Sequence, residues 1–111
     1  MRVISQDGTM DFPYEISTIF IYPSIENVIA IQSAGDSEIS IIGRYSSKAK
    51  AIKAMEMLRE QYGKLEVMKV LASGTAEYME KALATDEMIK HYNTYCDMNV
   101  FQFPQDDEIE V

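Results

Sequence analysis

The stretch Tyr45-Ser-Ser-Lys-Ala-Lys-Ala-Ile-Lys-Ala-Met-Glu-Met-Leu-Arg59 decides how this chain folds. It predicts a helix over residues 46–63, because Ser46 or Ser47 can cap its start and Gly63 suits the left-handed end of a helix. At about 100° per residue, one side of this helix collects apolar side chains. They are Ala51, Met55, Leu58 and Tyr62, with Ile52 at the edge. We therefore expect this side to cover a sheet.

Residues 1–45 are typical of strands. Met1 to Ser5 and Thr9 to Phe12 flank Asp7-Gly8, a dipeptide that favours a tight hairpin. Three further runs rich in isoleucine, valine and aromatic residues are separated by sequences that favour turns. These runs are residues 18–22, 27–32 and 38–44. Their spacing predicts an antiparallel sheet.

The rest of the chain predicts additional short helices and one more strand. Residues 64–98 favour helix, with Thr75 and Thr85 as N-caps of two short helices. Residues 99–104 favour a strand that Pro104 ends. The acidic residues 105–111 predict a frayed tail. The expected fold is one α+β domain over residues 1–111, in which one long helix covers a sheet of about five to six short strands.

Charge and composition narrow the classes of function. Eighteen acidic and ten basic residues give a net charge of −8, which opposes generic binding to nucleic acid. A small anionic ligand would need a local group of cations. The single cysteine, Cys96, excludes an intrachain disulfide. The chain also lacks a signal peptide or a membrane-spanning run, so we expect a cytoplasmic protein.

The sequence contains few residues suited to catalysis. It has one histidine and one cysteine, and it carries no Gly-x-Ser-x-Gly elbow, no Gly-Lys-Ser/Thr phosphate loop and no His-Glu-x-x-His motif. His91 falls outside the apolar arc of its predicted helix, where a solvated side chain is typical. Cys96 falls within that arc and is expected to be a small buried hydrophobe. We expect no enzyme activity, no metal site and no cofactor.

Cations on the main helix suggest an anion site instead. Lys48 and Arg59 project into the arc between Met55 and Ile52, although they are about 16 Å apart along the helix. The commoner explanation is that their long stems cover the sheet edge while their charged ends reach water. The alternative is anion capture, for which Arg59 is suited because its planar guanidinium binds phosphate bidentately. Arg44 adds a cation near the helix N-terminus.

A nucleotide also needs a ring on which its base can stack. Tyr45, Tyr62, Phe101 and Phe103 are the aromatic residues nearest to these cations in the sequence. Each of them also fits a place in the core, since Phe101 and Phe103 alternate as the buried side of a strand does. The predicted ligand-binding residues are Arg2, Arg44, Lys48, Arg59, Tyr62, Phe101 and Phe103.

Three stretches carry a family resemblance: Met1-Arg-Val-Ile-Ser-Gln-Asp-Gly8, residues 45–59, and Phe101-Gln-Phe-Pro-Gln-Asp-Asp-Glu108. Together they resemble small prophage proteins of low-GC Gram-positive bacteria, and among these the Thoeris anti-defence type 1 family. That resemblance implies a sponge built from dimers, which holds glycocyclic ADP-ribose between protomers and in some members cyclic oligonucleotides at a second site. Its pockets use arginines and aromatic rings. The residues that carry over are Arg2, Lys48, Arg59, Phe101 and Phe103.

Two alternatives from other classes remain open. An acidic protein could inhibit a bacterial defence system by binding it directly, as an anti-CRISPR protein does. The chain could also be an assembly module of the phage itself. The sponge hypothesis further predicts a homo-oligomer in the infected host cell, and Met57 on the polar side of the main helix favours self-association.

Overall fold

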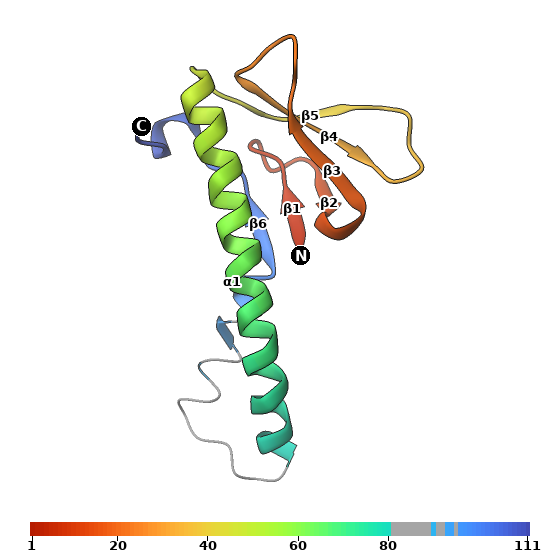
Figure 1. Cartoon of the computed structure of the whole chain (residues 1–111), viewed down its shortest axis with the longest axis vertical. Coiled ribbons are helices and arrows are strands. Elements are labelled where there is room, and N and C mark those ends of the chain that lie inside the picture. The colour runs from red at the N-terminus through yellow and green to blue at the C-terminus, as the bar shows by residue number, and fades with distance from the viewer. Residues whose placement is uncertain (81–89, 91–92, 95) are drawn as a thin grey trace.

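The α+β class is confirmed by the computed structural model, which describes residues 1–80, 90, 93–94 and 96–111. These residues contain six strands and one long helix (Figure 1). The strands are β1 (Arg2–Ile4), β2 (Asp11–Pro13), β3 (Ser17–Ile21), β4 (Val28–Ser33), β5 (Ser40–Arg44) and β6 (Val100–Gln102). The helix is α1 (Lys48–Glu80), and two 3-10 turns are η1 (Tyr14–Ile16) and η2 (Asp106–Glu108).

The strands form two sheets, so the prediction of one antiparallel sheet of five to six strands is wrong. One sheet has the order β2-β1-β6, and β6 runs parallel to β1. The other has the order β3-β4-β5 and is antiparallel, with a bulge near Ile29 and Ala30. The predicted hairpin around Asp7-Gly8 is present as the β1–β2 pair. Gly8 has a φ of +77°, which glycine adopts without steric cost.

The division into two sheets begins at Pro13. Proline ends β2, and η1 then turns the chain so that β3 starts a second sheet instead of continuing the first. Gln6 joins the two sheets across this division. Its backbone N–H donates to the Ile42 carbonyl at 2.7 Å, and its side-chain oxygen accepts from the Arg44 N–H at 2.8 Å.

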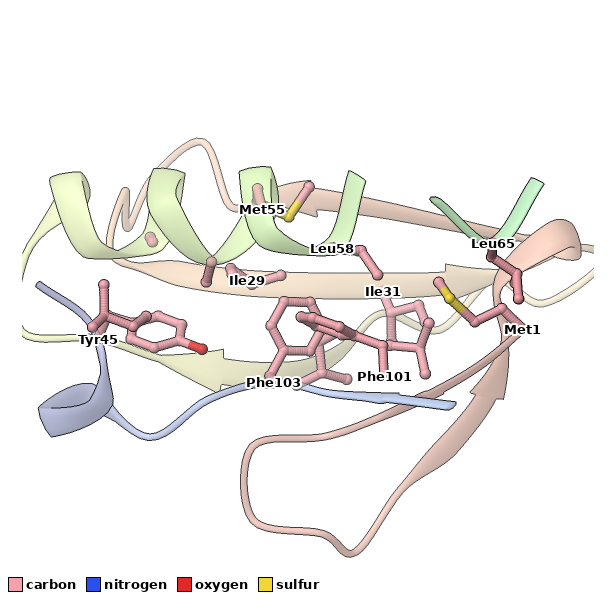
Figure 2. Packing of buried hydrophobic residues seen from close by; sticks show 14 residues of the cluster. Met1, Ile29, Ile31, Tyr45, Met55, Leu58, Leu65, Phe101 and Phe103 are labelled. Atoms are coloured by element: carbon pink, nitrogen blue, oxygen red, sulfur yellow. The ribbon is translucent and has the colours of Figure 1, made fainter. Parts of the chain in front are cut away.

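The core lies between α1 and the inner faces of the two sheets (Figure 2). Leu58 of α1, Ile31 of β4 and Phe103, which follows β6, are each at most 1% exposed. Phe101 and Phe103 pack edge to face, with ring centroids 5.3 Å apart at 87°. Burial of the Ala51, Met55 and Leu58 side of α1 agrees with the predicted amphipathic pattern.

The helix α1 is longer than predicted. It passes through Gly63, and its last residue is Glu80. Of the described glycines only Gly8 and Gly35 have positive φ, so Gly63 is not a C-terminal cap. The apolar stripe continues from Leu58 to the buried Leu65, which keeps the chain helical past the glycine. The separate helices predicted in residues 64–98 are therefore wrong up to Glu80, and Thr75 lies inside α1. The helix predicted from Thr85 falls mainly outside the described residues.

The acidic C-terminal segment is ordered by specific contacts, which contradicts the predicted fraying. Gln105 and Glu108 form a capping box around η2. Ile109 is only 4% exposed and belongs to the core cluster. Asp106 accepts a hydrogen bond from the Ser46 backbone N–H at 2.7 Å, just before α1 begins. One buried isoleucine is enough to anchor a segment whose composition alone suggests a solvated tail.

Within the described residues, no helix combines the length and the apolar character that crossing a membrane requires.

Candidate functional site

The structure separates the four predicted cations. Arg2 pairs with Asp11, with 2.8 Å between Nε and Oδ1, and both side chains are about half exposed. Lys48 pairs with Glu26, at 3.3 Å from Nζ to Oε2. Arg44 and Arg59 are both exposed, and neither forms an ion pair with any residue that the structure describes. These two arginines are therefore the predicted cations left free to bind an anion.

Arg59 and Tyr62 line one groove between α1, η1 and the edge strand β3. The groove has a volume of about 390 Å³. Its lining residues are Tyr14, Glu15, Ser17, Ile19, Met55, Leu58, Arg59 and Tyr62. In α1 the lining residues Met55, Leu58, Arg59 and Tyr62 follow the i, i+3, i+4, i+7 pattern, which places them on one helix side. This is the one site among those described here that combines a predicted arginine with a predicted ring, and we call it the Arg59 groove.

Tyr14 is the residue that the sequence analysis missed. Pro13 ends β2, and η1 then turns Tyr14 toward α1. Its ring centroid lies 4.4 Å from that of Tyr62, and the two planes are tilted by 40°. Both rings are half-buried, so part of their surface remains accessible. The one signal in the sequence was an aromatic residue directly after a proline that ends a strand.

In the Arg59 groove the acidic residue has a charged partner, and the arginine has none among the described residues. Glu15, its only acid, binds the α-amino group of Met1, and this hydrogen bond lowers the pKa of Glu15. Burial raises the pKa of Tyr62, and the nearby carboxylate of Glu66 raises it further. Tyr62 is therefore a neutral phenol at physiological pH, and its hydroxyl is already hydrogen-bonded to Glu66. Since Glu15 already has a cationic partner, Arg59 is the uncompensated charge.

Phe101 and Phe103 lie in the core, where little of either ring is accessible. They are 6% and 0% exposed and pack edge to face. A depression of about 510 Å³ runs along the outer side of this segment, between it and Met57 and Gln61 of α1. Gln61 donates to the Val100 carbonyl there at 2.8 Å. This depression consequently exposes strand edge and amide groups rather than the two rings.

The stretches 1–8, 45–59 and 101–108 meet at one place in the fold. Tyr45 Oη donates to the Pro104 carbonyl at 2.9 Å, and Gln6 Nε2 donates to the same carbonyl at 3.2 Å. Lys50 Nζ binds the carbonyl of Asp106 at 2.8 Å and its Oδ2 at 3.2 Å. We call these five residues the junction. Its polar groups bind one another, which indicates a structural role.

Two carboxylates near the junction have lowered pKa values. The Ser46 backbone N–H, followed by Lys50, lowers the pKa of Asp106. Hydrogen bonds from Thr9 and Ser5 lower the pKa of Asp7 to about 2. Asp7 Oδ1 accepts from Ser5 Oγ at 2.7 Å, from Thr9 Oγ1 at 2.7 Å and from the Thr9 N–H at 3.0 Å. The polar Ser5-Gln6-Asp7-Gly8 segment thus performs turn chemistry.

The remaining predicted residues lie apart from the Arg59 groove. Arg44 lines a small depression of about 210 Å³ beside Gln6 and Asp7. Cys96 is exposed, which contradicts the expected burial, and His91 lies outside the described residues. Because the structure leaves Arg44 near the junction and Arg59 near Tyr14, the two free arginines belong to different sites.

Comparison with known proteins adds no relative, since the chain matches no protein-family model, no curated protein and no solved structure.

Proposed function

We propose that this protein binds and sequesters cyclic nucleotide immune signals of the cyclic ADP-ribose type without altering them. The observation that carries the proposal is the Arg59 groove, which places an uncompensated guanidinium beside two partly accessible tyrosine rings. Its volume of about 390 Å³ lies within the range of about 300–1,000 Å³ that small-molecule sites occupy. The family resemblance of the sequence supports the same function in the cytoplasm of an infected bacterium.

Arg59 is suited to the phosphate groups of such a ligand. Its guanidinium presents paired N–H donors that match two phosphate oxygens. The net charge of −8 repels anions at long range, so recognition depends on this local cation. The groove is also bounded by Met55 and Leu58, whose apolar surfaces reduce the competition of water for the hydrogen bonds.

Tyr14 and Tyr62 are suited to the base. Their rings meet at 40°, so a planar base can lie against the accessible face of one ring and contact the edge of the other. The Tyr62 hydroxyl remains protonated at neutral pH and is hydrogen-bonded to Glu66, so Tyr62 offers the base its ring face rather than a free donor.

Sequestration fits the groove better than catalysis does. Glu15 is a poor general base, because the Met1 amino group holds its carboxylate in the ionised state with a lowered pKa. The raised pKa of Tyr62 likewise makes it a poor acid at neutral pH. A ligand that enters would be bound by Arg59 and the rings and later released intact.

Calorimetry against a panel of cyclic ADP-ribose isomers and cyclic di- and trinucleotides tests the proposal. We expect at least one ligand to bind, and mass spectrometry of the heat-released material to recover the molecule that was added. Recovery of a hydrolysed product would contradict sequestration. Absence of binding across the panel, together with retained inhibition of a defence system, would favour the acidic protein-binding inhibitor instead.

A further inference from the structure

The edge strand β3 exposes unpaired backbone groups beside the Arg59 groove. The Tyr22 N–H donates to the Val28 carbonyl at 2.9 Å, and the Ala34 N–H donates to the Ile16 carbonyl at 2.8 Å. These bonds show that the even-numbered residues of this segment bind β4. In an antiparallel ladder the intervening residues point the other way. The N–H and C=O groups of Ile19 and Ile21 therefore face the open edge.

This edge lacks the usual protection against pairing. Natural edge strands are commonly blocked by lysine, proline or a bulge. Residues 17–21 have the sequence Ser-Thr-Ile-Phe-Ile, with no charge and no proline, and β3 pairs with β4 in continuous register. In the part of the chain that the structure describes, no residue binds the outward groups of Ile19 and Ile21.

We propose that a second copy of this chain pairs antiparallel with β3 across a two-fold axis at Phe20. The proposal deepens the proposed function and rests on it for the identity of the ligand. In this register Ile19 lies opposite Ile21 of the partner subunit, and each outward N–H meets an outward C=O. The two sheets of the order β3-β4-β5 then join into one continuous sheet. Phe20 lies opposite Phe20 of the partner subunit, in a close cross-strand pair without hydrogen bonds.

The ends of β3 select this register over its neighbours. The Ser17 N–H already donates to the Tyr14 carbonyl, and Pro23 has no N–H. A register centred on Phe20 places Ser17 opposite Pro23 of the partner subunit. Neither residue has an available N–H, so no donor is left unpaired at this position. A register centred on Ile19 would instead place the Ile21 carbonyl opposite the occupied Ser17 N–H. The self-complementary pattern of donors therefore favours a second copy as the occupant of this edge.

Pairing along β3 would complete the ligand site. Ser17 and Ile19 line the Arg59 groove, so the groove borders the edge that the partner joins. A two-fold axis perpendicular to the sheet places both α1 helices on the same side of it. The partner strand then adds a wall to the Arg59 groove beside Ser17 and Ile19.

Light scattering without ligand tests the pairing through a charge exchange at Phe20. We expect the wild type to have at least twice the monomer mass of 12.6 kDa at micromolar concentration. F20K and F20E should each be monomers, because like charges would face each other at the axis. An equimolar mixture of the two should recover the dimer. T18K, on the same face but away from the axis, should remain dimeric. A monomeric wild type, dimeric single variants or a mixture that stays monomeric would each overturn the pairing.

A disulfide test covers the case in which a charged residue at position 20 prevents folding. In a Cys96→Ser background, Phe20→Cys should form an intermolecular disulfide on mild oxidation, because close cross-strand pairs have Cα separations of about 4.5 Å. Thr18→Cys should not, since this register places it opposite Tyr22 of the partner subunit. Equal cross-linking of both variants, or cross-linking of Thr18→Cys alone, would overturn the register.

Calorimetry separates failure of the pairing from failure of the proposed function. A dimeric wild type that binds no cyclic nucleotide would remove the sponge function but leave the pairing intact. If the wild type binds, folded monomeric F20K should bind the same nucleotide about tenfold more weakly, since its groove lacks the wall that the partner strand adds. Equal affinity in the two proteins would show that the pairing does not contribute to the ligand site.

Discussion

The Arg59 groove and the junction both contain cationic and tyrosine side chains, but these differ in whether they have partners within the chain. In the junction Gln6, Tyr45, Lys50 and Asp106 find partners in other segments of the chain. In the groove Arg59 forms no ion pair with the residues that the structure describes. Satisfied polar groups stabilise a fold, whereas an uncompensated cation beside accessible rings is free to bind. The comparison separates residues that build the domain from residues that can recognise a ligand.

Leu58→Ala should have the largest effect, because Leu58 belongs to the core and also forms part of the groove wall. It is 1% exposed, and we expect the free energy of unfolding to fall by about 2–5 kcal/mol. Urea denaturation followed by circular dichroism measures this loss. Val70→Ala, at a position that is 74% exposed, should change it by less than about 0.5 kcal/mol. Similar values for the two variants would show that α1 does not cover the core as described.

Tyr45→Phe tests whether the ligand binds at the junction or in the Arg59 groove. It removes the hydrogen bond to the Pro104 carbonyl, which keeps only the longer bond from Gln6. The expected loss of unfolding free energy is about 0.5–1.5 kcal/mol. Affinity for a cyclic nucleotide should be unchanged at a temperature where the variant is folded. A large loss of affinity with unchanged stability would assign the ligand site to the junction.

Asp7→Asn should have a small effect that depends on pH. Because the folded-state pKa of Asp7 is about 2 and its ordinary value is 3.8, the ionised carboxylate stabilises the fold above pH 3.8. This contribution is lost as the pH falls from 3.8 toward 2. As the pH falls through this interval, the melting temperature should therefore fall less steeply for Asp7→Asn than for the wild type. Parallel declines would show that Asp7 does not hold the turn through its charge.

The sequence predicted individual helices and hairpins better than the pairing of strands that are distant in the chain. The periodicity of Ala51, Met55 and Leu58 predicted the buried side of α1, and Asp7-Gly8 predicted the first hairpin, since both depend on neighbouring residues. The place of β6 in the first sheet depends on its parallel pairing with β1, which joins chain segments about a hundred residues apart. No local pattern specifies such a contact.

The candidate site shows the same limit. The cation of Arg59 and the ring of Tyr62 could be found from the helical wheel because they share one helix side. Tyr14 joins them only through the turn after Pro13, and that placement depends on the packing of η1 against α1. Phe101 and Phe103 were ambiguous between core and ligand site, and the tertiary fold places them in the core.

The most direct test of the account is calorimetry of Arg59→Ala and Arg44→Ala with the cyclic nucleotide that the wild type binds most tightly. Both variants remove an exposed arginine without an ion pair among the described residues, so their effects on net charge are matched. We predict that Arg59→Ala weakens binding about tenfold or more, because a charge-assisted bond to phosphate contributes about 1.5–3 kcal/mol. Arg44→Ala should retain nearly the wild-type affinity. Unchanged binding by Arg59→Ala, or an equal loss in both variants, would contradict the assignment of the ligand site to the Arg59 groove.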